Sequence, residues 1–82
     1  MSENFVDALG LKCPLPVLLT RRALAKSASG AVIAVQADDP LASLDLPLFC
    51  TQEGHELLGV QAAKRGRIFR IRKGSSALAG RF

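Results

Sequence analysis

The sequence predicts an α+β fold, a two-layer α/β sandwich in which two helices pack on one face of a four-stranded mixed sheet, in the order β-α-β-α-β-β. Three observations support this prediction. A nearly continuous apolar, β-branched segment spans residues 31–38, two helical patterns each end at a glycine, and two short strand-like segments flank a Lys-Arg-Gly turn near the C-terminus. Helices and strands in this order can bury one face of the sheet in a two-layer arrangement.

The size and composition of the chain fit a single small domain. Its 82 residues, 49% of them hydrophobic, allow one modest core, so we expect one domain with an ordered core at about 4–74 and a flexible tail at 75–82. The first residues are polar and mildly acidic, unlike a secretory signal, and no apolar run approaches the ~20 residues that span a bilayer. We therefore expect a cytoplasmic protein without membrane contacts. With one histidine and no Cys-x-x-Cys pair, we expect no metal and no cofactor.

The first half of the chain contains two predicted strands and a helix. A short strand is expected at Asn4–Leu9. From Val17 onward apolar residues recur at helical spacing, which predicts a helix to about Ser29 that ends at Gly30. The segment Ala31–Asp38 is apolar and β-branched, so it is expected to lie in the interior of the sheet.

The second helix is predicted from two similar signals. Asp39 precedes Pro40, and Asp45 stands two residues before Pro47, so each aspartate could accept a bond from a free N–H at the start of a helix. We therefore expect a short helical turn at Pro40 and a main helix from about Asp45 to Glu53, closed by the next glycine.

The last two strands are predicted at His55–Ala62 and Arg67–Lys73. Apolar and basic residues alternate in the second, as in a sheet with one covered face and one solvated face. The net charge is +4, and all seven acidic residues precede a basic cluster. This cluster could bind an acidic protein or nucleic acid, or be a solvated outer face. Its members are Lys64, Arg65, Arg67, Arg70, Arg72 and Lys73.

The tetrapeptide Cys13-Pro14-Leu15-Pro16 places a thiol at the start of the first helix. Proline is tolerated in a first helical turn and favours extended backbone before it, so Cys13 is predicted to be the N-cap. Free N–H groups and the helix dipole would then favour the thiolate and lower the thiol pKa. Cys13 is therefore a candidate nucleophile, and the alternative is a plain capping residue.

Several spaced motifs together resemble the small TusA/SirA-like sulfur-carrier family over nearly the whole chain. The resemblance implies a sulfurtransferase of the sandwich fold described above, whose cysteine accepts a sulfane sulfur as a persulfide from a donor such as a cysteine desulfurase and passes it to an acceptor protein. In members of the family that sulfur serves tRNA thiolation, molybdenum-cofactor or other sulfur metabolism. The motifs are Asp7-Ala8-Leu9-Gly10-Leu11-Lys12-Cys13-Pro14-Leu15-Pro16, Ala37-Asp38-Asp39-Pro40, Asp45-Leu46-Pro47-Leu48-Phe49-Cys50, Gly54-His55-Glu56-Leu57 and Ile71-Arg72-Lys73.

The resemblance assigns the persulfide to Cys13. The surrounding residues Pro14, Leu15, Pro16, Asp39 and Asp45 would shape the helix starts and the partner surface, and the two aspartates are interpreted as N-caps rather than as general acids or bases. Leu15 is expected to be exposed beside the thiol, where it could influence the choice of partner.

Cys50, the second thiol, could resolve a persulfide or form a redox disulfide with Cys13, but we favour a buried, small hydrophobic residue on the second helix. Arg21 could either extend outward along the apolar face of the first helix or project toward the thiol. Leu19, near Arg22 and Lys26, could belong to a docking surface or be an isolated exposed leucine.

Two alternative functions remain open. The first is a regulatory module that binds RNA or an acidic protein through Arg67, Arg70, Arg72 and Lys73, independently of Cys13. Direct nucleic-acid binding ranks below sulfur transfer, since it leaves the Cys-Pro-Leu-Pro motif unexplained. The second is a thiol redox regulator that needs a Cys13–Cys50 disulfide.

Overall fold

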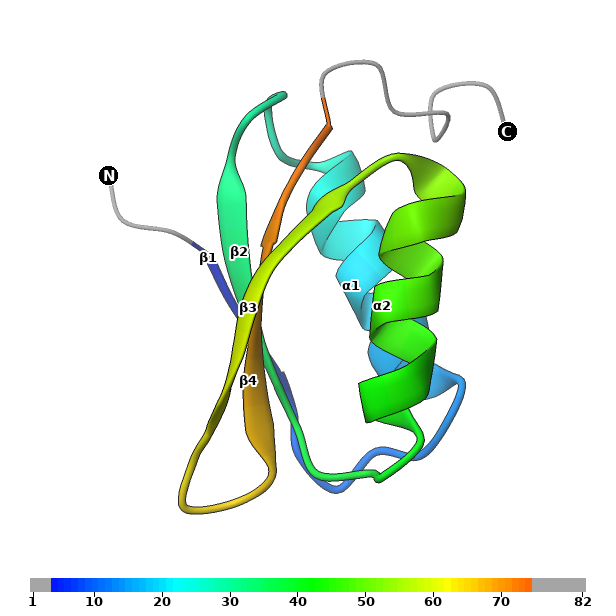
Figure 1. Cartoon of the computed structure of the whole chain (residues 1–82), viewed down its shortest axis with the longest axis vertical. Coiled ribbons are helices and arrows are strands. Elements are labelled where there is room, and N and C mark those ends of the chain that lie inside the picture. The colour runs from blue at the N-terminus through cyan, green and yellow to red at the C-terminus, as the bar shows by residue number, and fades with distance from the viewer. Residues whose placement is uncertain (1–3, 75–82) are drawn as a thin grey trace.

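The computed structural model describes residues 4–74 and confirms the predicted fold class. Both helices pack on the same face of one four-stranded sheet (Figure 1). Neither helix in the described part of the chain is long and apolar enough to cross a membrane. The tail predicted at 75–82 lies outside the described residues. The elements are β1 (Asn4–Ala8), α1 (Leu15–Ala25), β2 (Val32–Ala37), α2 (Ala42–Glu53), β3 (Glu56–Ala62) and β4 (Arg67–Arg72).

The strand order in the sheet is β1-β2-β4-β3, with β1 and β3 at its edges. β1 and β2 are parallel and are joined through α1, whereas β4 is antiparallel to both of its neighbours. The carboxyl ends of β1 and β2 therefore lie at the same end of the sheet, together with the beginning of β4. Both helices also begin at this end of the sheet (Figure 1). This arrangement brings three chain segments that are distant in sequence to one end of the molecule.

The core lies between the sheet and the two helices. The predicted alternation in β4 is confirmed, because Phe69 and Ile71 are fully buried while Arg70 and Arg72 are exposed on the other face. Phe69 stands opposite Val35 of β2. The other buried hydrophobic residues that pack with these three are Ala8, Leu24, Ile33, Ala37, Ala42, Leu46, Phe49 and Cys50.

Helix α1 is shorter at its C-terminus than predicted. It ends at Ala25, so the expectation that it reaches Ser29 was wrong. The N–H groups of Lys26 and Ser27 bond to carbonyls three residues back, at 3.3 and 3.0 Å, which is the tighter 3₁₀ pattern. The Ser27 hydroxyl also donates to the Ala23 carbonyl at 2.8 Å, and such side-chain bonds compete with helical ones.

Helix α2 begins three residues earlier than predicted, at Ala42 rather than Asp45. The predicted turn at Pro40 exists, but it runs directly into the helix. The N–H of Ala42 bonds to the Asp39 carbonyl at 2.9 Å. Pro47 therefore lies inside α2, where it removes one backbone donor and does not mark the first turn. Gly54 closes the helix in the left-handed conformation, as expected, and β3 starts at Glu56 rather than His55.

Candidate functional site

Cys13 lies in the loop between β1 and α1 and is exposed. The prediction that it is the N-cap of α1 was wrong. Pro14, which follows a cis peptide bond, takes that position, and its carbonyl accepts the N–H of Leu18 at 3.1 Å. Pro16 is buried at the start of the helix. Cys13 therefore sits one residue before the helix cap, with its side chain free to approach other groups.

The loop after β2 holds the Cys13 loop in place. Asp39 accepts the backbone N–H of Cys13 with one carboxylate oxygen at 2.7 Å, and that of Leu41 with the other at 3.2 Å. Asp38 accepts the N–H of Gly10 at 2.9 Å. Asp39 was predicted to cap a helix, but α2 has no side-chain cap. Its carboxylate instead joins the start of α2 to the backbone of the nucleophile.

The thiol of Cys13 donates a hydrogen bond to Oδ2 of Asp45, with Sγ and the oxygen 2.9 Å apart. Asp45 was also expected to be an N-cap, and it lies instead in the first turn of α2. Its bond to the thiol is the main reason why the pKa of Cys13 is raised, with smaller contributions from desolvation and from the charges of Asp45 and Asp39. The prediction of a lowered pKa was wrong, because two carboxylates near the thiol outweigh the partial positive charge of a helix end.

Two arginines extend the site on the side of the β3–β4 turn. Arg65 forms an ion pair with Asp38 at 2.7 Å. The hydrogen bond from the Gly10 N–H, followed by the bond from Arg65, lowers the pKa of Asp38. Arg67, the first residue of β4, donates to the hydroxyl of Ser43 at 2.8 Å. Sequence reasoning grouped both arginines with a remote basic patch. The missed signal is the strand pairing. If β2 and β4 are antiparallel neighbours, β4 must begin at the end of the sheet where β2 finishes.

Lys64 lies in the same β3–β4 turn as Arg65, but the other three basic residues of the predicted cluster lie elsewhere in the described structure. Arg70 and Arg72 are on the sheet face opposite the helices, where Arg72 pairs with Glu56. Lys73 donates to the Ser27 carbonyl at 2.8 Å, at the other end of the sheet. The cluster is therefore divided between the two ends of the sheet and the sheet face opposite the helices. Its binding to nucleic acid stays a prediction.

Cys50 packs in the core, where it is 2% exposed, as the favoured interpretation expected. Burial raises the pKa of its thiol to about 11, which suppresses the thiolate. Both cysteines are free thiols. That Cys50 resolves a persulfide stays a prediction.

Arg21 extends across to α2 and does not project toward Cys13. Its guanidinium pairs with Glu53 at 2.6 Å and lies over the ring of Phe49, 5.5 Å from the ring centre. Glu53 ends α2, and Cys13 lies near the beginning of that helix, so Arg21 belongs to the opposite end of the helix pair. It joins the two helices there.

The surroundings of the thiol offer apolar contact area and a small pocket. Leu15 is 46% exposed, as expected, and Leu18 is exposed on the first turn of α1. Leu41 at the N-cap of α2, and Leu44 and Leu48 within that helix, are exposed as well. The loops also form a pocket of about 190 Å³, lined by Gly10, Leu11, Lys12, Asp38, Asp39 and Pro40. Within residues 4–74 no three His, Cys, Asp or Glu side chains are grouped as a metal site would require. The exposed Cys13 thiol, bonded to the Asp45 carboxylate, can present a nucleophilic sulfur to another molecule, with that carboxylate as its proton acceptor.

A comparison with known protein families gives a match that agrees with this arrangement. The model of the family described as Sulfurtransferase TusA matches residues 4–73. The matched segment includes every strand and helix of the described structure, and both loops that form the Cys13 site. The chain therefore belongs to the TusA sulfurtransferase family.

Proposed function

We propose that this sulfurtransferase carries sulfur as a persulfide on Cys13, accepting it from a donor protein such as a cysteine desulfurase and passing it to an acceptor protein. The observation that carries the proposal is the exposed Cys13 thiol, bonded to the Asp45 carboxylate on a loop that Asp39 holds from the backbone. The acceptor would serve tRNA thiolation or another route of sulfur trafficking.

The proposed transfer exchanges one sulfur–sulfur bond for another. The Cys13 sulfur, after loss of its proton, attacks the terminal sulfur of the donor persulfide. A new bond joins that terminal sulfur to Cys13, the S–S bond within the donor breaks, and the donor cysteine leaves as a thiolate that takes up a proton. The sulfane sulfur keeps its oxidation state, so no external oxidant or reductant is needed. Transfer to the acceptor repeats the same exchange.

Asp45 is proposed to take part in this step as the acceptor of the thiol proton. Its Oδ2 already accepts the S–H, so the proton can move to it before the sulfur attacks the donor persulfide. At rest the same bond keeps the thiol protonated and less nucleophilic. The exposed leucines around Cys13 are proposed to contact the donor and acceptor, because single-sulfur transfer requires two protein surfaces to approach each other closely.

The proposal is tested by loading the protein with sulfur in vitro. The chain is incubated with a cysteine desulfurase and cysteine, and intact-mass and peptide-mapping measurements then locate any added sulfur. We expect one sulfur atom on Cys13, none in the Cys13→Ala variant, and unchanged loading in the Cys50→Ala variant. Loading that persists in Cys13→Ala, or that never occurs with several desulfurases, would refute the proposal.

The same experiment separates the alternative functions. A disulfide between Cys13 and Cys50 under mild oxidation, without sulfur loading, would favour a redox regulator. Salt-dependent RNA binding that survives Cys13→Ala and weakens in Arg70→Ala and Arg72→Ala would favour the binding module.

A further inference from the structure

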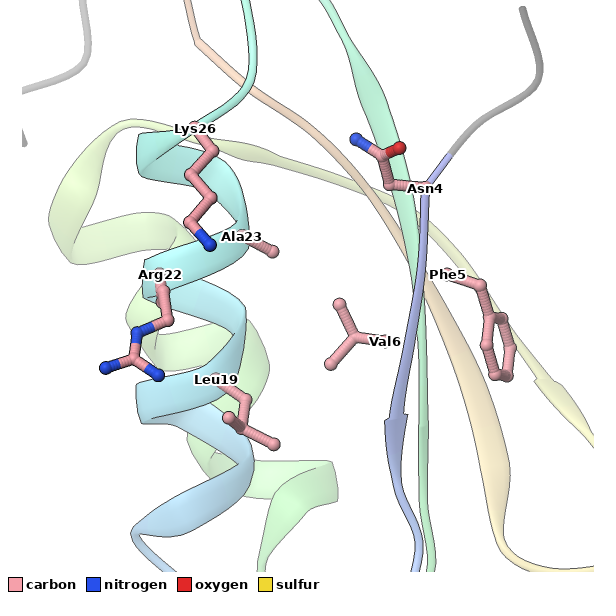
Figure 2. Close-up of a pocket in the computed structure, with 7 residues that line it drawn as sticks. All are labelled: Asn4, Phe5, Val6, Leu19, Arg22, Ala23 and Lys26. Carbon is pink, nitrogen blue, oxygen red and sulfur yellow. The ribbon is translucent and has the colours of Figure 1, made fainter.

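A groove runs between α1 and the edge strand β1. Figure 2 shows the side chains that line it, which come from these two elements alone. Its volume is about 440 Å³, and neither Cys13 nor its aspartate partners line it. The lining residues are Asn4, Phe5, Val6, Leu19, Arg22, Ala23 and Lys26.

The floor of the groove is apolar. Val6 of β1 and Leu19 and Ala23 of α1 are only partly buried, and all three pack against the core. Leu19 is therefore not an isolated exposed leucine, because it shares this floor with residues from a second element. A ligand placed here would complete the burial of three side chains that the protein leaves partly open to water.

The helix side of the groove is basic. Arg22 and Lys26 are exposed, lie one helical turn apart, and line the groove from the side of α1. Within residues 4–74 neither of them forms an ion pair or a side-chain hydrogen bond. Two cations four residues apart on a helix repel each other, so an anionic group between them would be stabilised by both.

The strand side of the groove is an open edge of the sheet. In the described residues β1 pairs with β2 only, so its other edge is available for hydrogen bonds. β1 has neither lysine nor proline, the residues that commonly protect edge strands. Figure 2 shows Phe5 and Val6 pointing to opposite faces of the strand, and Phe5 is 57% exposed. Apolar contacts are therefore available on both faces of the edge.

We propose that β1 binds an extended segment of a partner protein in which acidic and apolar residues alternate, as an added strand beside β1. Backbone hydrogen bonds would form along the open edge, and apolar side chains would cover Phe5 on one face of the strand. On the other face, the acidic side chains would cross Val6 and place their carboxylates beside Arg22 and Lys26. A second copy of this chain fits less well, since the net charge of +4 and the same two cations would repel it. A partner held here would leave Cys13 uncovered, so this inference does not rest on the sulfur chemistry.

The test uses the ¹⁵N-labelled full chain and a blocked peptide of alternating valine and glutamate. We expect chemical-shift changes in β1 and α1, slower amide exchange in β1, and a Kd about fivefold higher in Lys26→Glu and in Arg22→Glu. Lys64→Glu, which makes the same charge change in the β3–β4 turn, should leave the Kd unchanged. All three side chains are exposed, so the variants should keep the fold and the Cys13 sulfur loading of the parent.

Several outcomes would overturn the proposal. These are no peptide binding, equal binding by Lys26→Glu, and equal binding of a peptide with lysine in place of glutamate. Strand addition would be refuted if β1 amides exchange at their original rate, or if valine N-methylation leaves the affinity unchanged. Binding of decanoate in the groove without peptide binding would assign it to a small apolar anion instead.

Discussion

The Cys13 thiol and the Asp45 carboxylate form a hydrogen bond of 2.9 Å that joins the β1–α1 loop to the first turn of α2. This bond, rather than the end of α1, dominates the electrostatic surroundings of the sulfur. The raised pKa of Cys13 means that most of the resting protein carries a thiol and not a thiolate. A nucleophile protected in this way reacts slowly with solutes until Asp45 takes its proton or moves away.

Replacing Asp45 with alanine should make Cys13 more reactive toward small alkylating reagents. The variant loses the bond and the charge that raise the thiol pKa, so a larger fraction is thiolate at any pH below that pKa. The rate of iodoacetamide modification, measured against pH, should show a profile shifted to lower pH. Glu56→Gln removes a carboxylate distant from the thiol and should keep the parent profile. An unshifted profile in Asp45→Ala would contradict the assigned cause of the raised pKa.

Replacing Asp39 with alanine should loosen the Cys13 loop. The side chain accepts the N–H groups of Cys13 and Leu41, and the variant leaves both without that partner. We expect the free energy of unfolding to fall by about 1–2 kcal/mol, and the Cys13 amide to exchange faster with solvent. Asp7→Ala is the matched control, because among the described residues Asp7 accepts a hydrogen bond only from the N–H of Leu9, outside this site. Equal exchange at Cys13 in both variants would argue against a positioning role for Asp39.

Gly66→Ala should be far more destabilising than Gly10→Ala. Both glycines have positive φ, 63° at Gly66 and 78° at Gly10. An added Cβ at Gly66 would lie 2.0 Å from the Ala37 carbonyl oxygen, whereas an added Cβ at Gly10 would lie within 4 Å of no described residue beyond its chain neighbours. Backbone strain alone predicts about 1–2 kcal/mol for Gly10→Ala, and the clash adds about 1–3 kcal/mol for Gly66→Ala. Urea unfolding of the two variants measures the difference. Equal losses would mean that the β3–β4 turn does not pack against the end of β2 in solution.

The buried Cys50 thiol should make the protein less stable at high pH. Its pKa is about 11 in the folded chain against 9.0 for an ordinary thiol, so the unfolded state loses its proton first as the pH rises. The contribution of Cys50 is complete below pH 9 and is lost toward pH 11, at no more than about 1.4 kcal/mol per pH unit. The stability difference between the parent and Cys50→Ala should therefore shrink over this range. A constant difference would show that Cys50 does not titrate there.

Sequence reasoning identified the elements of the fold because each had a local signal. The alternation in β4 and the glycine after α2 correctly indicated a covered sheet face and a helix end. Starts of helices were less predictable. Pro47 resembled a first-turn proline, but α2 begins at Ala42 and continues past it, which the local pattern did not indicate.

The sequence also pointed to Cys13 and its neighbouring residues but not to their contacts. Asp39 and Asp45 were chosen for the right chain positions and given the wrong task, since a cap is a local interaction and their bonds to Cys13 span 26 and 32 residues. Arg65 and Arg67 were missed for a similar reason. Their place beside the site follows from the pairing of β2 with β4, which local patterns do not encode.

The links between the Cys13 loop and the rest of the molecule have a consequence for recognition. All of the described side-chain bonds to Gly10 and Cys13 come from Asp38, Asp39 and Asp45, whereas Leu11, between them, packs against the core. The Cys13 end of the loop can therefore move while Leu11 keeps its place against the core. A protein that drew this loop outward would separate the thiol from Asp45 and lower its pKa in the same movement. The sulfur would then become reactive only in the presence of the partner that is close enough to use it.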